Sequence, residues 1–246
     1  MLPMSTLLRS CRQLLLAVFF VVFAAWAWGE AAQWLLRWHA QHLLADIRSL
    51  EVNRSTWSDA QPIMHKWIED SSPRGACTQQ ACNYEIDIVQ TLPPALIGNP
   101  TAGDHNWLPR LVDHIGLRSA AARAGFTIEQ GVVTTKWFGE QATPPVNDWH
   151  AGANYIPYLS VSAAETSHFH QIAGDQKLPH PDRLVQHKSS YIAVTFAPDE
   201  EPAERTALMD FRFTCITRLN PCETQADILP EAMRMLQEQE LNPPSR

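Results

Sequence analysis

The chain has 246 residues, with 26 acidic and 19 basic side chains and a formal net charge of −7. Clustered lysine and arginine side chains form the electrostatic footprint of proteins that bind nucleic acid or anionic lipid surfaces. An acidic chain without such clusters therefore predicts no nucleic-acid partner.

The N-terminal segment contains an uncharged, almost wholly apolar stretch from Gln13 to Gly29, which follows Arg9 and Arg12. A helix rises about 1.5 Å per residue and needs roughly 20 mostly apolar residues to cross a bilayer core. The stretch is slightly short alone, but it continues past Glu30, which would lie near the headgroups. Four tryptophans crowd this end, as in an interfacial aromatic belt: Trp26, Trp28, Trp34 and Trp38. We therefore expect a transmembrane helix at 13–36.

The charges that flank the span predict its orientation. Basic residues precede it and no acidic residue does, so the positive-inside rule places residues 1–12 in the cytoplasm. The rest of the chain is then extracytoplasmic, which in a bacterial cell would be the periplasm. The alternative is a cleaved signal peptide, for which Ala25-Trp26-Ala27 supplies a small-x-small triplet.

Helical periodicity continues beyond the span, because Leu36, Leu43, Ile47 and Leu50 recur at spacings of seven, four and three residues. This pattern predicts one long helix with a juxtamembrane stalk at 37–54, and it favours a retained anchor over a cleaved signal. The stripe is close to coiled-coil spacing, which predicts a homodimer through the stalk. The alternative is that the stripe packs against the chain's own domain or lies against lipid.

Four of the five cysteines follow the span, namely Cys77, Cys82, Cys215 and Cys222. An even count in an oxidising compartment predicts two disulfides, and zinc ribbons favour shorter spacings than these. Pairing within each couple closes short loops, whereas pairing between the couples would tie the start of the domain to its end. The spacing alone leaves both connectivities open.

A single extracytoplasmic domain is expected over 55–240, followed by a flexible tail at 241–246. Periodicity and turn residues predict helices at 56–69, at 108–115 and from Pro230, strands at 84–89, 155–163, 191–197 and 211–215, and a β-hairpin at 126–138 around Gly131. The polar stretch at 165–190 is expected to be a loop, and Ser160 and Ser162 are expected on the solvent face of a strand. Strands outnumber helices without strict alternation, so the predicted class is α+β with a mainly antiparallel sheet.

Three segments carry a resemblance to a known kind of protein. They are Leu50-Glu51-Val52-Asn53-Arg54-Ser55-Thr56-Trp57 before a helix, Cys77 to Cys82 with Tyr84-Glu85-Ile86, and Cys222 with Leu229-Pro230-Glu231-Ala232. This layout is similar to bacterial single-pass membrane proteins that carry a cysteine-containing extracytoplasmic domain. The resemblance covers most of the chain, and its motifs are structural. It implies a tethered domain and no particular activity.

Potential metal ligands are densest in one histidine-rich stretch, which holds His168, His170, Asp175, His180, Asp182 and His187. Alternate positions on a strand face the same side, so His168 and His170 could chelate one metal ion. No third ligand has a fixed spacing, and surface histidines explain the stretch more simply.

Motifs for nucleophilic catalysis, zinc proteases and phosphate loops are absent from the sequence, so no catalytic, cofactor-binding or metal-ligating residue is assigned. The expected function is that of a membrane-anchored domain that binds or scaffolds a partner at the cell envelope. The alternative is a membrane-tethered, metal-dependent hydrolase that uses the histidine-rich loop 168–187.

Overall fold

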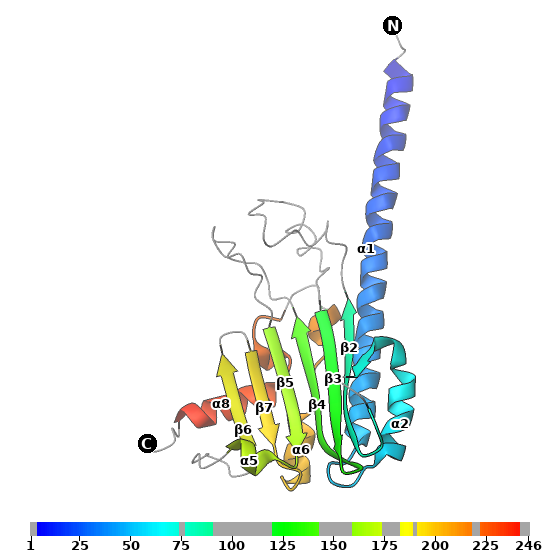
Figure 1. Cartoon of the computed structure of the whole chain (residues 1–246). Coiled ribbons are helices and arrows are strands. Elements are labelled where there is room, and N and C mark those ends of the chain that lie inside the picture. Colours follow the sequence, from blue (N-terminus) through cyan, green and yellow to red (C-terminus); the bar gives the residue numbers. More distant parts are fainter. Residues whose placement is uncertain are drawn as a thin grey trace.

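The computed structural model describes residues 4–73, 77–90, 120–142, 159–173, 183–188, 191–217 and 222–241. Its first element is the 46-residue helix α1 (Met4–Ser49), whose N-terminal half extends away from the domain while its C-terminal half lies along a sheet (Figure 1). The extended half exposes apolar side chains such as Phe19, Phe20 and Val21. In the described part of the chain, α1 is the one helix long and apolar enough to cross a membrane.

A seven-stranded mixed sheet forms the centre of the described domain, in the order β1-β2-β3-β4-β5-β7-β6 (Figure 1). The strands are β1 (Ser71–Pro73), β2 (Ala81–Gln90), β3 (Ala120–Glu129), β4 (Val132–Ala142), β5 (Leu159–Thr166), β6 (Arg183–Lys188) and β7 (Tyr191–Phe196). All neighbouring strands are antiparallel except β5 and β7, which are parallel. The predicted α+β class with a mainly antiparallel sheet is confirmed.

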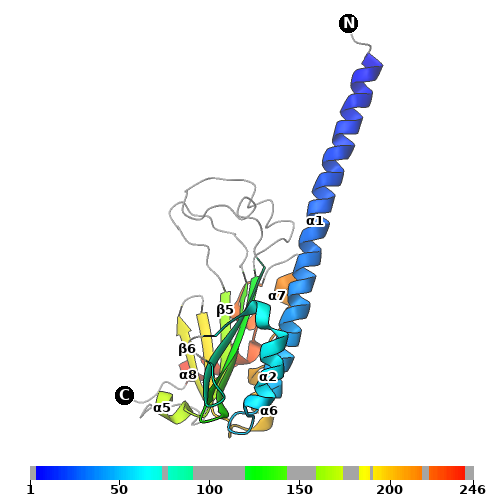
Figure 2. The same cartoon turned by 45° about the vertical axis from the view of Figure 1, so that its right-hand side comes forward.

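Most of the helices pack on one face of this sheet (Figure 2). The remaining helices are α2 (Trp57–Lys66), η1 (Ile68–Asp70), α5 (Phe169–Ala173), α6 (Pro202–Leu208), α7 (Thr214–Thr217), η2 (Gln225–Asp227) and α8 (Pro230–Leu241). One hydrophobic core joins α1, α2, α7 and α8 to the inward side chains of the strands, which alternate along each strand with outward ones. Phe126, Phe138 and Phe196 are completely buried in it.

The second half of α1 belongs to this core. Leu36, Leu43, Ile47 and Leu50 are each at most 4% exposed and pack with the inward residues of the sheet. The helix is continuous from the span, as the periodicity indicates, but the residues of the expected stalk are a layer of the domain itself. A homodimer through this stripe would have to remove it from the core, so packing against the chain's own domain is the alternative that the structure supports.

Several local predictions are confirmed. The hairpin β3–β4 turns at Gln130 and Gly131, whose φ angles of 54° and 84° suit a type I′ turn. The strands predicted around residues 84–89 and 191–197 are β2 and β7, and the helix from Pro230 is α8. Helix α2 begins one residue after Thr56, whose backbone N–H donates to the Asp59 carboxylate at 2.7 Å.

Other local predictions are wrong. No strand forms at 211–215, because Phe211 and Phe213 both pack edge-on against Phe138, with ring centroids 4.8 and 5.8 Å apart, and the chain then turns into α7. The stretch at 165–190 is not all loop, since it contains the end of β5, α5 and the edge strand β6. The predicted helix at 108–115 lies outside the described residues.

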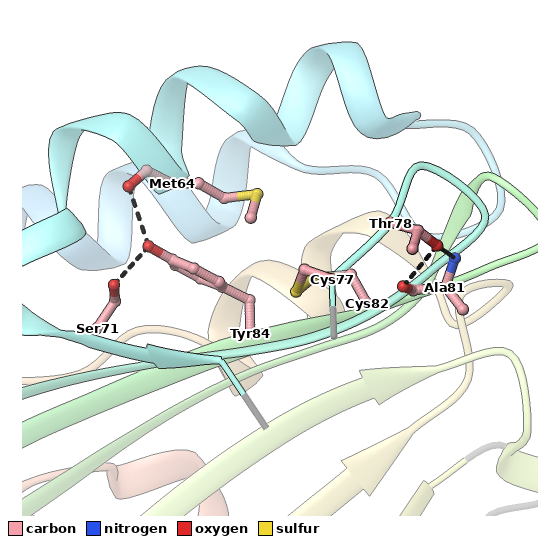
Figure 3. Close-up of a disulfide and its surroundings, with 7 residues drawn as sticks. All are labelled: Met64, Ser71, Cys77, Thr78, Ala81, Cys82 and Tyr84. Carbon is pink, nitrogen blue, oxygen red and sulfur yellow. Dashed lines mark hydrogen bonds between the residues drawn. A yellow bond between two sulfur atoms is a disulfide. The ribbon is translucent and has the colours of Figure 1, made fainter. Parts of the chain in front are cut away.

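Both cysteine couples pair locally, as Cys77–Cys82 and Cys215–Cys222. The first bridge lies where the chain enters β2 (Figure 3). Nearby, the Tyr84 hydroxyl lies 3.0 Å from the carbonyl oxygen of Met64 and 2.6 Å from Oγ of Ser71, which ties β2 to the end of α2 (Figure 3). Two short covalent loops therefore fasten segments at the beginning and the end of the domain.

Candidate functional site

The sheet face turned away from α1, here called the open face, contains a hollow of about 370 Å³. Its floor consists of small residues because the register places them side by side across three strands. Gly139 of β4 pairs with Ser162 of β5, and Ser162 pairs with Ala193 of β7. A large side chain at any of these positions would fill the hollow, so the cavity depends directly on the sequence.

Two aromatic side chains border the hollow. Trp137 projects from β4 and Tyr191 from the start of β7, where it is 39% exposed. The Trp137 indole lies against Gly125 of β3, because a Cβ atom at that glycine would be only 2.7 Å from the indole Nε1. The Tyr191 hydroxyl lies 3.4 Å from Oγ of Ser162 on the floor. The rim thus combines flat apolar rings with a phenol group.

The charged residues at the hollow largely neutralise one another. Asp87 of β2 and Arg123 of β3 are directly opposed in the sheet, and their Oδ1 and Nε atoms are 2.6 Å apart. Of the charged groups, Arg123 and Glu85 line the hollow, and together with Asp87 they carry a formal charge of −1. The remaining polar lining is uncharged and consists of Gln141, Ser160, Ser162, Gln186 and Thr195. Amide and hydroxyl groups both donate and accept hydrogen bonds, so this lining suits a neutral polar ligand.

Helix α5 covers the open face beside the hollow at the β6 and β7 end. Phe169 and Ala173 of α5 form a small separate core with Leu184 of β6 and Ala197, and all four are buried. Leu184 pairs with Thr195, which lines the hollow. The open face is therefore covered next to the hollow and accessible over it.

Buried charges lie on the opposite, helix-covered side of the same strands. Lys136 and Glu165 project inward from β4 and β5 with Nζ and Oε2 3.3 Å apart, and Arg205 of α6 lies 2.6 Å from the other carboxylate oxygen. The Lys136 ammonium also donates to the carbonyl oxygen of Leu50, at the end of α1. Burial lowers the pKa of Lys136 although Glu165 opposes this effect. This cluster fastens α1 and α6 to the sheet.

Glu140 of β4 is a second buried charge site. Its side chain is completely buried, and neither carboxylate oxygen has a hydrogen-bond partner among the described residues. Burial raises the pKa of Glu140 well above its ordinary value, and the Arg37 guanidinium of α1 opposes the shift only in part. Arg37 itself donates to Oγ1 of Thr217 at 2.9 Å. Sequence reasoning missed Glu140, because the predicted hairpin ended at residue 138. Alternation with the buried Phe138 and Ala142 on the longer strand places Glu140 inward.

His168 and His170 do not occupy alternate positions of one strand, which a shared metal site would require. His168 lies in a turn and His170 in α5, so the alternation that would direct both rings to one side is absent. The His168 Nε2 lies 3.0 Å from the Glu129 carboxylate. His187 is exposed on β6, whereas Asp175, His180 and Asp182 lie outside the described residues. Within the described segments, no group of three His, Cys, Asp or Glu side chains could hold a metal ion.

Ser160 and Ser162 lie on the open face, as the alternation of β5 predicts, but the hollow itself was not predicted. Its sequence signal is the run of small outward residues on adjacent strands, which becomes visible only once the strands are aligned.

Comparisons of the chain with protein-family models, curated proteins and solved structures found no match. The open face is thus the feature from which a function can be inferred.

Proposed function

We propose that this protein is a single-pass membrane protein whose extracytoplasmic domain binds a neutral saccharide chain of the cell envelope on its open face. The observation that carries the proposal is the hollow with its two aromatic residues, its uncharged polar lining and its small-residue floor. The domain is a binding module, and the anchor keeps its ligand close to the membrane.

Three features support the anchoring and its orientation. Helix α1 is long and apolar enough to cross a bilayer, and Arg9 and Arg12 precede its apolar run. The two disulfides suit an oxidising compartment such as the periplasm. The helix passes from the apolar run into the domain core without a break, so cleavage after Ala27 would leave the core half of α1 as a new N-terminus.

The chemistry of the lining favours a saccharide over the other ligand classes. Sugar rings present apolar C–H faces that can lie on the rings of Trp137 and Tyr191, while their hydroxyls pair with amides and hydroxyls such as Gln141 and Ser160. An anionic ligand would meet the carboxylate of Glu85 and an arginine, Arg123, that is already paired with Asp87. A peptide that adds a strand needs a free sheet edge, whereas the hollow lies on the face of the sheet. All of its lining strands except the edge strand β6, which contributes Gln186, are already bonded on both sides.

Calorimetric titration of the full-length protein in lipid nanodiscs tests this proposal, with a neutral N-acetylglucosamine oligosaccharide and an oligosaccharide of the same length that carries carboxylates. We expect saturable binding of the neutral chain and at least tenfold weaker binding of the acidic one. Tyr191→Ser should weaken binding of the neutral oligosaccharide at least tenfold, because it removes the exposed ring from the rim. Gln237→Ala on the exposed surface of α8 is the matched control and should bind normally. Absence of binding, or equal binding by Tyr191→Ser, would overturn the proposal.

A further inference from the structure

Helix α1 carries an exposed apolar stripe that extends beyond the level at which the domain begins. Trp28, Trp34, Leu35 and Trp38, here called the tryptophan stripe, are 79%, 58%, 55% and 52% exposed. Water-exposed tryptophans in such a group are costly, because each leaves a large apolar ring hydrated. The stripe therefore indicates a surface that something apolar covers.

The tryptophan stripe lies on the side of α1 opposite the domain. Gln33, Leu36 and Ala40 are buried against the domain, at 1%, 4% and 0% exposure. At about 100° per residue, Trp38 projects roughly 170° away from the mean direction of these three side chains. One side of the helix thus enters the protein core while the other stays apolar and uncovered over the same turns.

Lipid is the occupant to which the geometry points, because the stripe is continuous with the apolar run of the same helix. The apolar surface of this side extends from residue 13 to Trp38, which is about 39 Å of helix against a hydrocarbon core of about 30 Å. A helix with an excess of this kind tilts, and tryptophan side chains prefer the headgroup region. Arg37, whose guanidinium lies 5.2 Å from the centre of the Trp34 ring, is a basic residue of the kind that anchors helix ends at the interface.

We infer that α1 leaves the bilayer obliquely, with the tryptophan stripe immersed in the headgroup layer and the domain resting on the upper side of the helix. The layers then follow in the order lipid, α1, sheet and open face, since the helices cover the sheet on the α1 side (Figure 2). The tilt turns the hollow away from the membrane and leaves it accessible to ligands from the compartment. This inference depends on the proposed anchoring and not on the identity of the ligand.

Spin-label depth measurements on the full-length protein in phosphatidylcholine liposomes test it. Cys11→Ser removes the fifth cysteine, and a label is then attached at Leu35→Cys, which leaves every tryptophan in place. The control label at Gln41→Cys is equally on the helix surface but lies beyond the stripe. We expect the Leu35 label to collide at least threefold more with oxygen than with a water-soluble nickel chelate, and the Gln41 label to show the reverse preference.

A second variant tests whether the tryptophan rings hold the stripe in the headgroup layer. Replacing Trp34 and Trp38 together by Ser should move the Leu35 label toward water, while both disulfides and the circular dichroism stay unchanged. A Leu35 label in water in the parent protein would overturn the inference, and so would spin–spin broadening between two chains, which would show a second copy on the stripe. Release of the protein by alkaline carbonate would instead contradict the anchoring, so the two failures are distinguishable.

Discussion

The indole of Trp137 on β4 occupies the space that a side chain at Gly125 on the adjacent strand β3 would need. A Cβ atom at residue 125 would lie 2.7 Å from the indole Nε1 and 2.6 Å from the carbonyl oxygen of Tyr84 on β2. The two residues are directly paired across the sheet. The glycine is required for space, and it sets the position of the ring that borders the hollow.

Gly125→Ala should therefore lower the free energy of unfolding by about 1–3 kcal/mol, the usual cost of overpacking. Chemical denaturation followed by circular dichroism measures this. Gly139→Ala is the matched control, because its added Cβ would lie 3.3 Å from the nearest atom, the carbonyl oxygen of Val161, and needs a smaller adjustment. An alanine at 125 that is no more destabilising than one at 139 would show that the indole moves freely.

The buried carboxylate of Glu165 should be the most sensitive charged position of the helix-covered face. Glu165→Gln leaves the Lys136 ammonium, whose side chain is 6% exposed, without its charged partner. We therefore expect the free energy of unfolding to fall by about 3–5 kcal/mol. Arg54→Gln is the control, since its pair with Glu51 is exposed and should contribute less than about 1 kcal/mol. Urea titrations of the two variants at one pH compare them. Similar losses in both would mean that burial does not strengthen the Lys136 pair.

Glu140 should make the domain less stable as the pH rises. Its pKa is raised in the folded chain, so between the ordinary value of 4.5 and the raised value the folded chain holds a proton that the unfolded chain releases. Stability is then highest below the ordinary value and falls until the pH passes the raised pKa. Glu140→Met removes the buried carboxylate at similar volume and should raise the free energy of unfolding at neutral pH by about 1–4 kcal/mol.

Denaturant titrations across a pH series check this prediction through the difference between the two proteins. The increase in the free energy of unfolding caused by Glu140→Met should be small below pH 4.5 and should grow toward neutral pH. Glu69→Met, at an exposed carboxylate, is the control and should show no such trend. A pH-independent gain would contradict a raised pKa for Glu140 in the folded chain.

Sequence periodicity predicted the elements that alternate clearly, and it failed where tertiary contacts decide. The hairpin around Gly131 and the strand through Tyr84 follow from local pattern alone. Phe211 and Phe213 alternate like strand residues, but their packing on Phe138 is a contact between segments far apart in the sequence, which periodicity does not contain. The core role of α1 was similarly ambiguous, because a narrow apolar stripe fits a partner helix and a sheet equally well. The hollow depends on three strands in register, which a single sequence does not specify.

The disulfides predict a pattern of thiol reactivity. If Cys77–Cys82 and Cys215–Cys222 are formed, an alkylating reagent applied without reductant to the denatured protein should modify Cys11 alone. Mass spectrometry counts the adducts, and proteolysis between the couples should release two peptides that each retain a bridge. Losing either bridge should cost about 2–3 kcal/mol, because both loops are short. Five adducts without reductant would contradict the oxidising compartment.

The orientation of α1 predicts where the domain resides. Arg9 and Arg12 precede the apolar run and no acidic residue does, so the N-terminus should remain in the cytoplasm. An enzyme reporter that needs an oxidising compartment, fused after Arg246, should then be active in bacterial cells, and a reporter that needs the cytoplasm should not. Changing both arginines to Glu should weaken or reverse this preference, whereas Arg54→Glu, on the domain surface, is the matched control and should leave it intact. A soluble product that begins near Trp28 would show cleavage in place of anchoring. That product would lack the apolar part of α1 but would keep Leu36 to Ile47, which pack in the core. Its free energy of unfolding would then show whether the second half of the helix is sufficient for folding.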